Sequence, residues 1–453
     1  MTRIAQYFDY QLGASAFTAI VVTVGIALQA DAGLITGNRS VGGVAVDVDG
    51  VVSAPTVEDD QALEKVRQTA LAEVPVDLQP FTELRAVSLK QIEAAIAKYR
   101  KEQLPIPDSV KCLAGLLRVQ YVLVYPDRED IVLAGPAEGW RSDALGNVVG
   151  ATTGRPVVLL DDLIVALRTR RSSRLEPISC SIDPTPEGLQ RYQKLQRELR
   201  AIGNPQTTLR RIEEAVGPQV ISITGVPASS RFARTMVAAD FRMKRLAMDL
   251  EQAPIDDLPS FMQLRKGSRG SHSKNMMPRW WLAPKYDALV RDVEGLSWEL
   301  RGQGVQCMTE QDYFDDQGER ERTVKAGPLA IRWAETFTKR FSDLADHDSA
   351  FGHLRNVIDL AVIAALIEKE QLLIRAGIEL PQLLQEEELK QFDVPRRVAT
   401  QASFVKQRKN WVISASGGVK LLPWEIADRN ETVEEVGEVH EKLSTDVDQW
   451  WWE

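Results

Sequence analysis

The stretch Pro177-Ile-Ser-Cys-Ser-Ile182 alternates apolar and polar residues, and Gln219-Val-Ile-Ser-Ile-Thr224 repeats that alternation further along the chain. A period of two predicts a β-strand at each stretch. Between them, Thr185-Pro-Glu187 offers proline and glutamate for the first turn of a helix, which favours a helix start. The centre of the chain, residues 176–275, is therefore predicted to be a β-α-β unit.

An α+β unit is predicted on the N-terminal side, over residues 33–175. Residues 42–53 alternate around Asp49-Gly50, and this dipeptide is typical of a hairpin turn. Apolar residues at helical or strand spacing follow. The helices and strands predicted from them cover residues 57–74, 88–103, 119–126 and 130–135.

On the C-terminal side, a helix is predicted from Ser229 or Ser230 to about Glu251, followed by a third unit over residues 276–425. That unit is predicted to contain strands at 279–282, 288–291 and 296–300, long helices at 328–346 and 349–376, and a final hairpin at 410–422. The acidic segment 426–453 is predicted to be disordered. The expected fold class is α+β: two or three units of mixed or antiparallel sheet with covering helices, and long C-terminal helices.

The N-terminal residues have the pattern of an export signal. An uncharged apolar run from Leu12 to Leu28 ends in Ala30-Asp-Ala-Gly33, and small residues at Ala30 and Ala32 suit a signal peptidase. We therefore expect residues 1–32 to be a signal peptide, with an uncleaved membrane anchor as the alternative. No later segment is expected to span a membrane, because the apolar stretch 357–367 contains Asp359 and is predicted to be a buried helix.

The net charge of −9 is unevenly distributed. Residues 431–453 contain eight acidic side chains against Lys442, so the remainder is close to neutral. Binding to nucleic acid is not expected of such a chain.

The three cysteines, Cys112, Cys180 and Cys307, are far apart and odd in number. We expect buried thiols, although one disulfide stays open as an alternative. None belongs to a Cys-x-x-Cys pair, so no redox motif or zinc ribbon is predicted.

No complete catalytic constellation is found, and no motif indicates a cofactor or a metal. Asp161 and Asp162 follow an apolar run, but the phosphate-binding Gly-x-x-x-x-Gly-Lys-Ser/Thr loop is absent from the sequence, and Asp161 is expected to cap a helix. His347 and His353 lie six residues apart, which places them on different sides of one helix. Asp240 and Lys244, at helical spacing, are expected to form a surface ion pair.

The turn from Gly225 to Arg231 lies between a predicted strand and a predicted helix. Ser229 and Ser230 are expected chiefly to cap that helix, and free amides at such a turn also make an anion site. Basic clusters could complete such a site if folding brings them together. The candidate anion-binding residues are Ser229, Ser230, Arg231, Arg265, Lys266 and Arg269; the tryptophans Trp280 and Trp281 could stack on a base or sugar.

Several strings resemble an uncharacterised family of exported proteins of planctomycete bacteria, known as a domain of unknown function. The strings are Val237 to Glu251, Cys180 to Glu187, Gly225 to Phe232 and Trp411 to Gly418. The resemblance spans about residues 40 to 425. It implies export and a planctomycete source, and it carries no activity, cofactor or catalytic residue.

The sequence therefore predicts an exported binding or assembly protein of the periplasm or cell envelope. The tail residues Trp450, Trp451 and Trp452 are the predicted contact with a protein partner, because exposed tryptophans are otherwise a solubility liability. The alternative is a hydrolase or anion-binding enzyme centred on Gly225 to Arg231.

Overall fold

In the computed structural model, two strands from distant parts of the chain pair side by side, and their backbones approach closely at Gly417. Gly417 has φ +142°, and a Cβ there would overlap the carbonyl oxygen of Trp280 on the neighbouring strand. Glycine is the residue that tolerates both conditions. The pairing places β18 (Ser416–Leu421) between β8 (Ile178–Asp183) and β10 (Asn275–Lys285) in the larger sheet.

The structure describes residues 44–54, 74–198, 204–266, 275–314, 320–323, 327–385, 391–404, 411–412, 415–445 and 450–451. Residues 38–453 form one compact unit. The predicted helix at 57–74, the signal residues Ala30 and Ala32, and Trp452 lie wholly or almost wholly outside the described residues.

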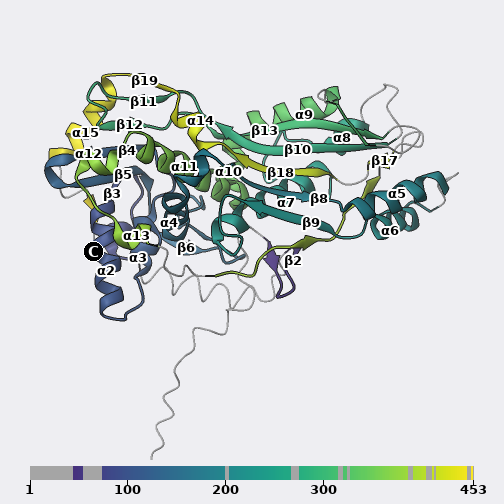
Figure 1. Ribbon diagram of the computed structural model, residues 1–453, viewed down its shortest axis with the longest axis horizontal. Helices are drawn as coiled ribbons and strands as arrows, with labels where there is room; N and C mark the ends of the chain where they lie inside the picture. Colours follow the sequence, from purple (N-terminus) through teal and green to yellow (C-terminus); the bar gives the residue numbers. More distant parts are fainter. Residues whose placement is uncertain are drawn as a thin grey trace, which may run out of the picture. The chain divides into compact units, whose positions relative to one another are not determined.

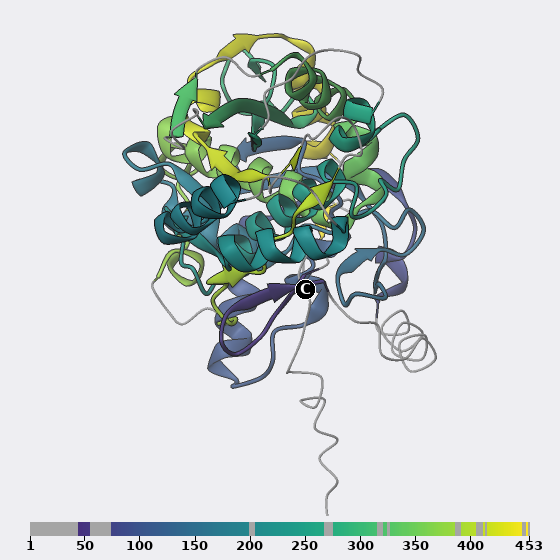
Figure 2. The same cartoon turned by 90° about the vertical axis from the view of Figure 1, so that its right-hand side faces the viewer.

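An eleven-stranded sheet runs in the order β1-β2-β15-β9-β8-β18-β10-β13-β14, with β17 beside β10 and β16 beside β17. Its remaining strands are β1 (Ala45–Val46), β2 (Val51–Ser53), β9 (Gln219–Thr224), β13 (Gly304–Phe314), β14 (Arg320–Thr323), β15 (Arg397–Val398), β16 (Ser403–Phe404) and β17 (Trp411–Val412). Figure 2 shows the purple β1–β2 hairpin at one end of this sheet.

A seven-stranded sheet has the order β19-β11-β12-β4-β5-β3-β20. Its strands are β3 (Thr82–Ser88), β4 (Tyr121–Tyr125), β5 (Asp130–Ala137), β11 (Leu289–Arg291), β12 (Ser297–Glu299), β19 (Asn430–Thr432) and β20 (Trp450–Trp451). A separate hairpin pairs β6 (Trp140–Ser142) with β7 (Val148–Gly150).

The helices of the described chain lie mainly between and around these sheets (Figure 1). They are α2 (Leu89–Lys101), α3 (Asp108–Lys111), α4 (Leu160–Thr169), α5 (Pro186–Glu198), α6 (Pro205–Val216), α7 (Arg231–Ala247), α8 (Phe261–Lys266), α9 (Pro328–Lys339), α10 (Phe341–His347), α11 (Ser349–Lys369), α12 (Leu372–Ala376), α13 (Pro381–Leu384), α14 (Pro423–Ala427) and α15 (Glu435–Thr445).

Helix α11 forms the centre of the core. Every residue from Ala350 to Ile367 is buried, and α11 packs against α4, α7, α10 and α14. In the described chain it is the one helix long and apolar enough to cross a membrane, and its apolar window is entirely buried within the fold. The prediction of a buried helix at 357–367 is confirmed.

Many local predictions are confirmed, and the fold class is α+β as predicted. The hairpin around Gly50 forms, α2 buries Ile92 and Ile96, and the strands at 119–126 and 130–135 pair as β4 and β5. In the central segment, two helices, α5 and α6, lie between β8 and β9, and these two strands pair antiparallel.

Three predictions on long-range organisation are wrong. The segment 410–422 is not a hairpin, because β17 and β18 both pair parallel with β10. The acidic segment 426–453 contains β19, α15 and β20 instead of being disordered throughout. Strand pairing also crosses the predicted unit boundaries, so the stretches 33–175, 176–275 and 276–425 do not each form a separate sheet.

We predict that Gly417→Ala unfolds the protein or lowers its free energy of unfolding by about 4 kcal/mol or more, because both the positive φ and the Trp280 carbonyl reject a Cβ. Gly154→Ala is the control, since Gly154 has φ +73° but open space around its Cβ position. This variant should lose only about 1 kcal/mol of unfolding free energy, because alanine disfavours the left-handed backbone conformation. Urea unfolding of both variants measures the difference, and equal losses would contradict the close approach.

Candidate functional site

Helix α7 carries an unusual number of buried charged side chains. The helix packs against β8, β18 and α11. As a result, four of its charged side chains are each less than a tenth exposed: Arg231, Arg234, Asp240 and Lys244. Charged groups are rarely buried without partners, because they lose their hydration. The partners of these residues therefore define what the helix can do.

The turn from Gly225 to Arg231 starts the helix as predicted. Gly225 has φ +77°, and the Ser230 Oγ accepts a hydrogen bond of 3.1 Å from the Ala233 amide, which makes Ser230 the N-cap. The Phe392 amide donates a bond of 2.9 Å to the Ser229 carbonyl, so a later segment lies against the turn. In the described residues no histidine or carboxylate hydrogen-bonds to the hydroxyl of Ser229 or Ser230.

Arg231 makes a buried three-membered cluster. Its Nη1 donates to the Asp162 carboxylate of α4, and its Nη2 lies 3.1 Å from Nδ1 of His353 on α11. A cationic guanidinium can only donate, so His353 accepts at Nδ1 and its proton belongs on Nε2. The charge of Arg231 is thus balanced inside the fold by Asp162.

Burial dominates the proton affinities of this cluster. Desolvation raises the pKa of Asp162 to about 6 although Arg231 opposes the shift. Desolvation, reinforced by Arg231, lowers the pKa of His353 well below its ordinary range. At neutral pH the cluster is therefore an ion pair beside a neutral imidazole.

The other candidate anion-binding residues each have contacts within their own part of the fold. Arg265 is buried in α8, and desolvation lowers its pKa. Lys266 bonds to Asp249 at 3.2 Å on the surface. Arg269 lies outside the described residues.

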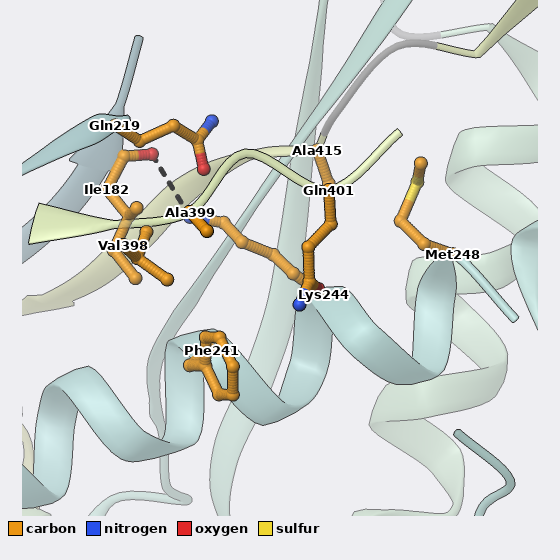
Figure 3. A pocket seen from close by; sticks show the side chains of 9 residues that line it. All are labelled: Ile182, Gln219, Phe241, Lys244, Met248, Val398, Ala399, Gln401 and Ala415. Atoms are coloured by element: carbon orange, nitrogen blue, oxygen red, sulfur yellow. Dashed lines mark hydrogen bonds between the residues drawn. The ribbon is translucent and has the colours of Figure 1, made fainter. Parts of the chain in front are cut away.

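A second buried ion pair lies at the other end of α7, where a surface pair was predicted. The prediction was wrong because this face of α7 packs under the larger sheet: Asp240 is 0% exposed and Lys244 8%. The Lys244 Nζ donates to the Asp240 Oδ2 at 2.8 Å. It also donates to the Ile182 carbonyl at 3.1 Å (Figure 3). Desolvation raises the pKa of Asp240 to about 6 against the effect of Lys244.

A small cavity adjoins this pair. It encloses about 20 Å³, which accommodates one water molecule. Figure 3 shows its lining residues, which are Ile182, Gln219, Phe241, Lys244, Met248, Val398, Ala399, Gln401 and Ala415. A cavity of this size holds no organic substrate.

The three cysteines are buried free thiols, as the sequence predicted. Burial raises the pKa of the Cys180 and Cys307 thiols far above the ordinary range, and the negative charge of Asp240 raises both further. Protonated thiols are poor nucleophiles. Cys307 is one of the residues that line an open groove of about 590 Å³ between β13 and α9, and the exposed Met308 and Ile331 also line it.

Other predicted site features are separated or absorbed into packing. Asp161 does not cap α4, since Leu159 is the N-cap residue. Trp280 is completely buried between Phe261 and Trp333 and cannot stack on a ligand. Among the described residues no group of three His, Cys, Asp or Glu side chains could hold a metal ion.

Sequence reasoning missed the Asp162–Arg231–His353 cluster because its members are 69 and 122 residues apart. The available signal was His353, a histidine inside the strongly apolar helix α11. Such residues require partners, but periodicity does not say which partners they are.

Comparison with known families gives one match. Residues 180–261 match the model of a protein family of unknown function, DUF1598. The matched segment runs from β8 to the start of α8 and contains Arg231 and the Asp240–Lys244 pair of α7. Comparisons with curated proteins and with solved structures found no match.

We predict that Asp240→Asn removes a pH dependence of stability. The folded-state pKa of about 6 exceeds the ordinary 3.8, so protonation of Asp240 favours the folded state below about pH 4, and this contribution is lost as pH rises through 6. The difference in unfolding free energy between the wild type and the variant should change by about 3 kcal/mol across this window. Urea unfolding at several pH values measures it.

Asp108→Asn serves as the matched control, because the Asp108 side chain is 58% exposed in a surface pair with Lys111. Its stability should follow the wild type at every pH. Parallel curves for the wild type and Asp240→Asn would refute the raised pKa of Asp240.

Proposed function

We propose that this protein is exported and acts as a binding or assembly protein of the periplasm or cell envelope. Support for export comes from the apolar run at Leu12 to Leu28 and the small residues Ala30 and Ala32. Support for binding comes from the C-terminal segment, which adds β20 in parallel beside β3 at the edge of the seven-stranded sheet. Strand addition to a sheet edge is also a common mode of peptide recognition.

That pairing is the observation on which the binding proposal rests. Trp450 is in register with Ala86, and Trp451 with Val87. Parallel pairing to an edge strand uses backbone hydrogen bonds that any extended chain can supply. The same Trp450 to Trp452 segment is the contact that we propose for a protein partner.

Among the described residues, the contacts of the turn from Gly225 to Arg231 do not favour the alternative enzyme. Ser230 Oγ serves the helix cap, and Arg231 is engaged by Asp162. Nucleophilic catalysis would need a base within hydrogen-bond reach of a serine hydroxyl.

We predict that the exported protein begins at Gly33. Removal of residues 1–32 follows from the cleavage site after Ala32. Intact-mass measurement of the protein from the periplasmic and envelope fractions tests this. Ala30→Lys together with Ala32→Lys is the matched variant and should retain the leader, whereas an intact Met1 in the wild-type exported protein would contradict cleavage.

We predict that a photo-crosslinking phenylalanine analogue at position 451 becomes joined to a second polypeptide as well as to β3 of its own chain. The reason is that this strand lies at the outer edge of its sheet. Crosslinking in the envelope fraction followed by peptide mass spectrometry identifies both products. The same analogue at the exposed position 435 of α15 is the control. Crosslinks to β3 found only in products with the mass of a single chain would argue against a partner contact.

A further inference from the structure

The C-terminal segment closes both edges of one sheet. We call residues 430–451 the C-terminal strap; the structure describes 430–445 and 450–451 of it. Its first strand, β19, pairs parallel with β11, and its last strand, β20, pairs parallel with β3. Figure 1 shows the yellow strap running from β19 to α15 along the side of this sheet.

Helix α15 covers an apolar face of the same sheet. Leu443 is fully buried in a cluster with Ala86, Leu123, Tyr125, Val132 and Ala134. The His440 ring stacks on Tyr125 at 4.2 Å between centroids, and its Nε2 lies 2.8 Å from the Val124 carbonyl. The Tyr125 hydroxyl and Arg128 donate to strap carbonyls at His440 and Ser444.

Helix α15 of the strap buries few side chains. Between Glu435 and Ser444, Val436 and Leu443 are the buried residues, whereas α11 is buried along most of its length. Elements with few buried apolar contacts open at lower free energy than the core. Opening of α15 would therefore leave the core around α11 folded.

When the strap opens, it uncovers a surface that is complementary to the strap sequence itself. The face around Tyr125 and the free edges of β3 and β11 would require a cover, and every other copy of the chain carries that cover. We propose that two copies exchange their C-terminal straps, so that each strap closes the sheet of the other copy. This proposal rests on the proposed function, in which the C-terminal segment contacts a protein partner. It adds that the partner is a second copy of the same chain.

The hinge for exchange is short and lies at a helix end. Only Asp428 and Arg429 separate α14 from β19, and their amides bond back to the Trp424 and Ile426 carbonyls. Lys369 Nζ donates to the Ala427 carbonyl at 2.8 Å and so holds α14 on the body. Exchange re-forms every strap contact, so the dimer differs from the monomer mainly at this hinge and in the entropy of association.

Cysteine trapping tests the exchange with the purified chain. Val290 on β11 and Glu431 on β19 are in register, so cysteines at these positions can be bridged when a strap lies on a sheet. A Val290→Cys copy is mixed with a Glu431→Cys copy at high concentration, equilibrated and oxidised. We expect a covalent heterodimer on a non-reducing gel, at several-fold the yield of a control mixture of Lys111→Cys with Glu431→Cys.

A chain with both Val290→Cys and Glu431→Cys provides the second arm. Its internal disulfide should lock the strap in place, and the locked chain should remain monomeric in size-exclusion chromatography under conditions where the reduced chain forms dimer. A heterodimer yield equal to the control, or failure of the double variant to form its disulfide, would overturn the exchange. Crosslinks from position 451 to a different protein, found without trapped heterodimer, would leave the proposed binding function standing and remove the second copy as the partner.

Discussion

The burial of α11 on every side is the constraint on which the rest of the structure depends. Its apolar residues need no partner beyond packing, but His353, Arg355 and Asp359 require specific polar neighbours. Arg231 bonds to His353, Asp346 to Arg355, and Arg118 with Tyr286 to Asp359. Asp346 lies on the preceding helix α10, whereas Arg231, Arg118 and Tyr286 come from segments far apart in the sequence. The polar groups therefore fix which elements surround the central helix.

Helix α7 meets the same requirement from the opposite side. Its buried Arg231 and Lys244 are each paired with a carboxylate whose pKa burial raises to about 6. A buried ion pair contributes little net stability compared with apolar packing, whereas removal of one partner is strongly destabilising. The two pairs therefore favour one arrangement of α7 over other apolar packings, and this structural role accounts for the charges buried in the helix.

Local patterns predicted local structure well because they depend on neighbours in the sequence. The Asp49-Gly50 turn, the buried face of α2 and the Ser230 cap all formed as expected. The long strand β13 was missed, and Asp240 was placed on the surface, because both depend on what packs against them from elsewhere. Periodicity identifies a buried face, but not which distant segment covers it.

The acidic C-terminal segment shows how composition misleads when a surface needs covering. Its glutamates lie mainly on the exposed side of α15, while Val436 and Leu443 lie on the buried side. Net charge counts both sides together and so indicates disorder, whereas the buried side of α15 and two edge pairings order the described part. Because β3 and β11 would otherwise be open edges, the strap protects the sheet from uncontrolled pairing. A segment that protects an edge in its own molecule is by the same chemistry able to bind that edge in another, and this links the stability of the fold to the proposed assembly.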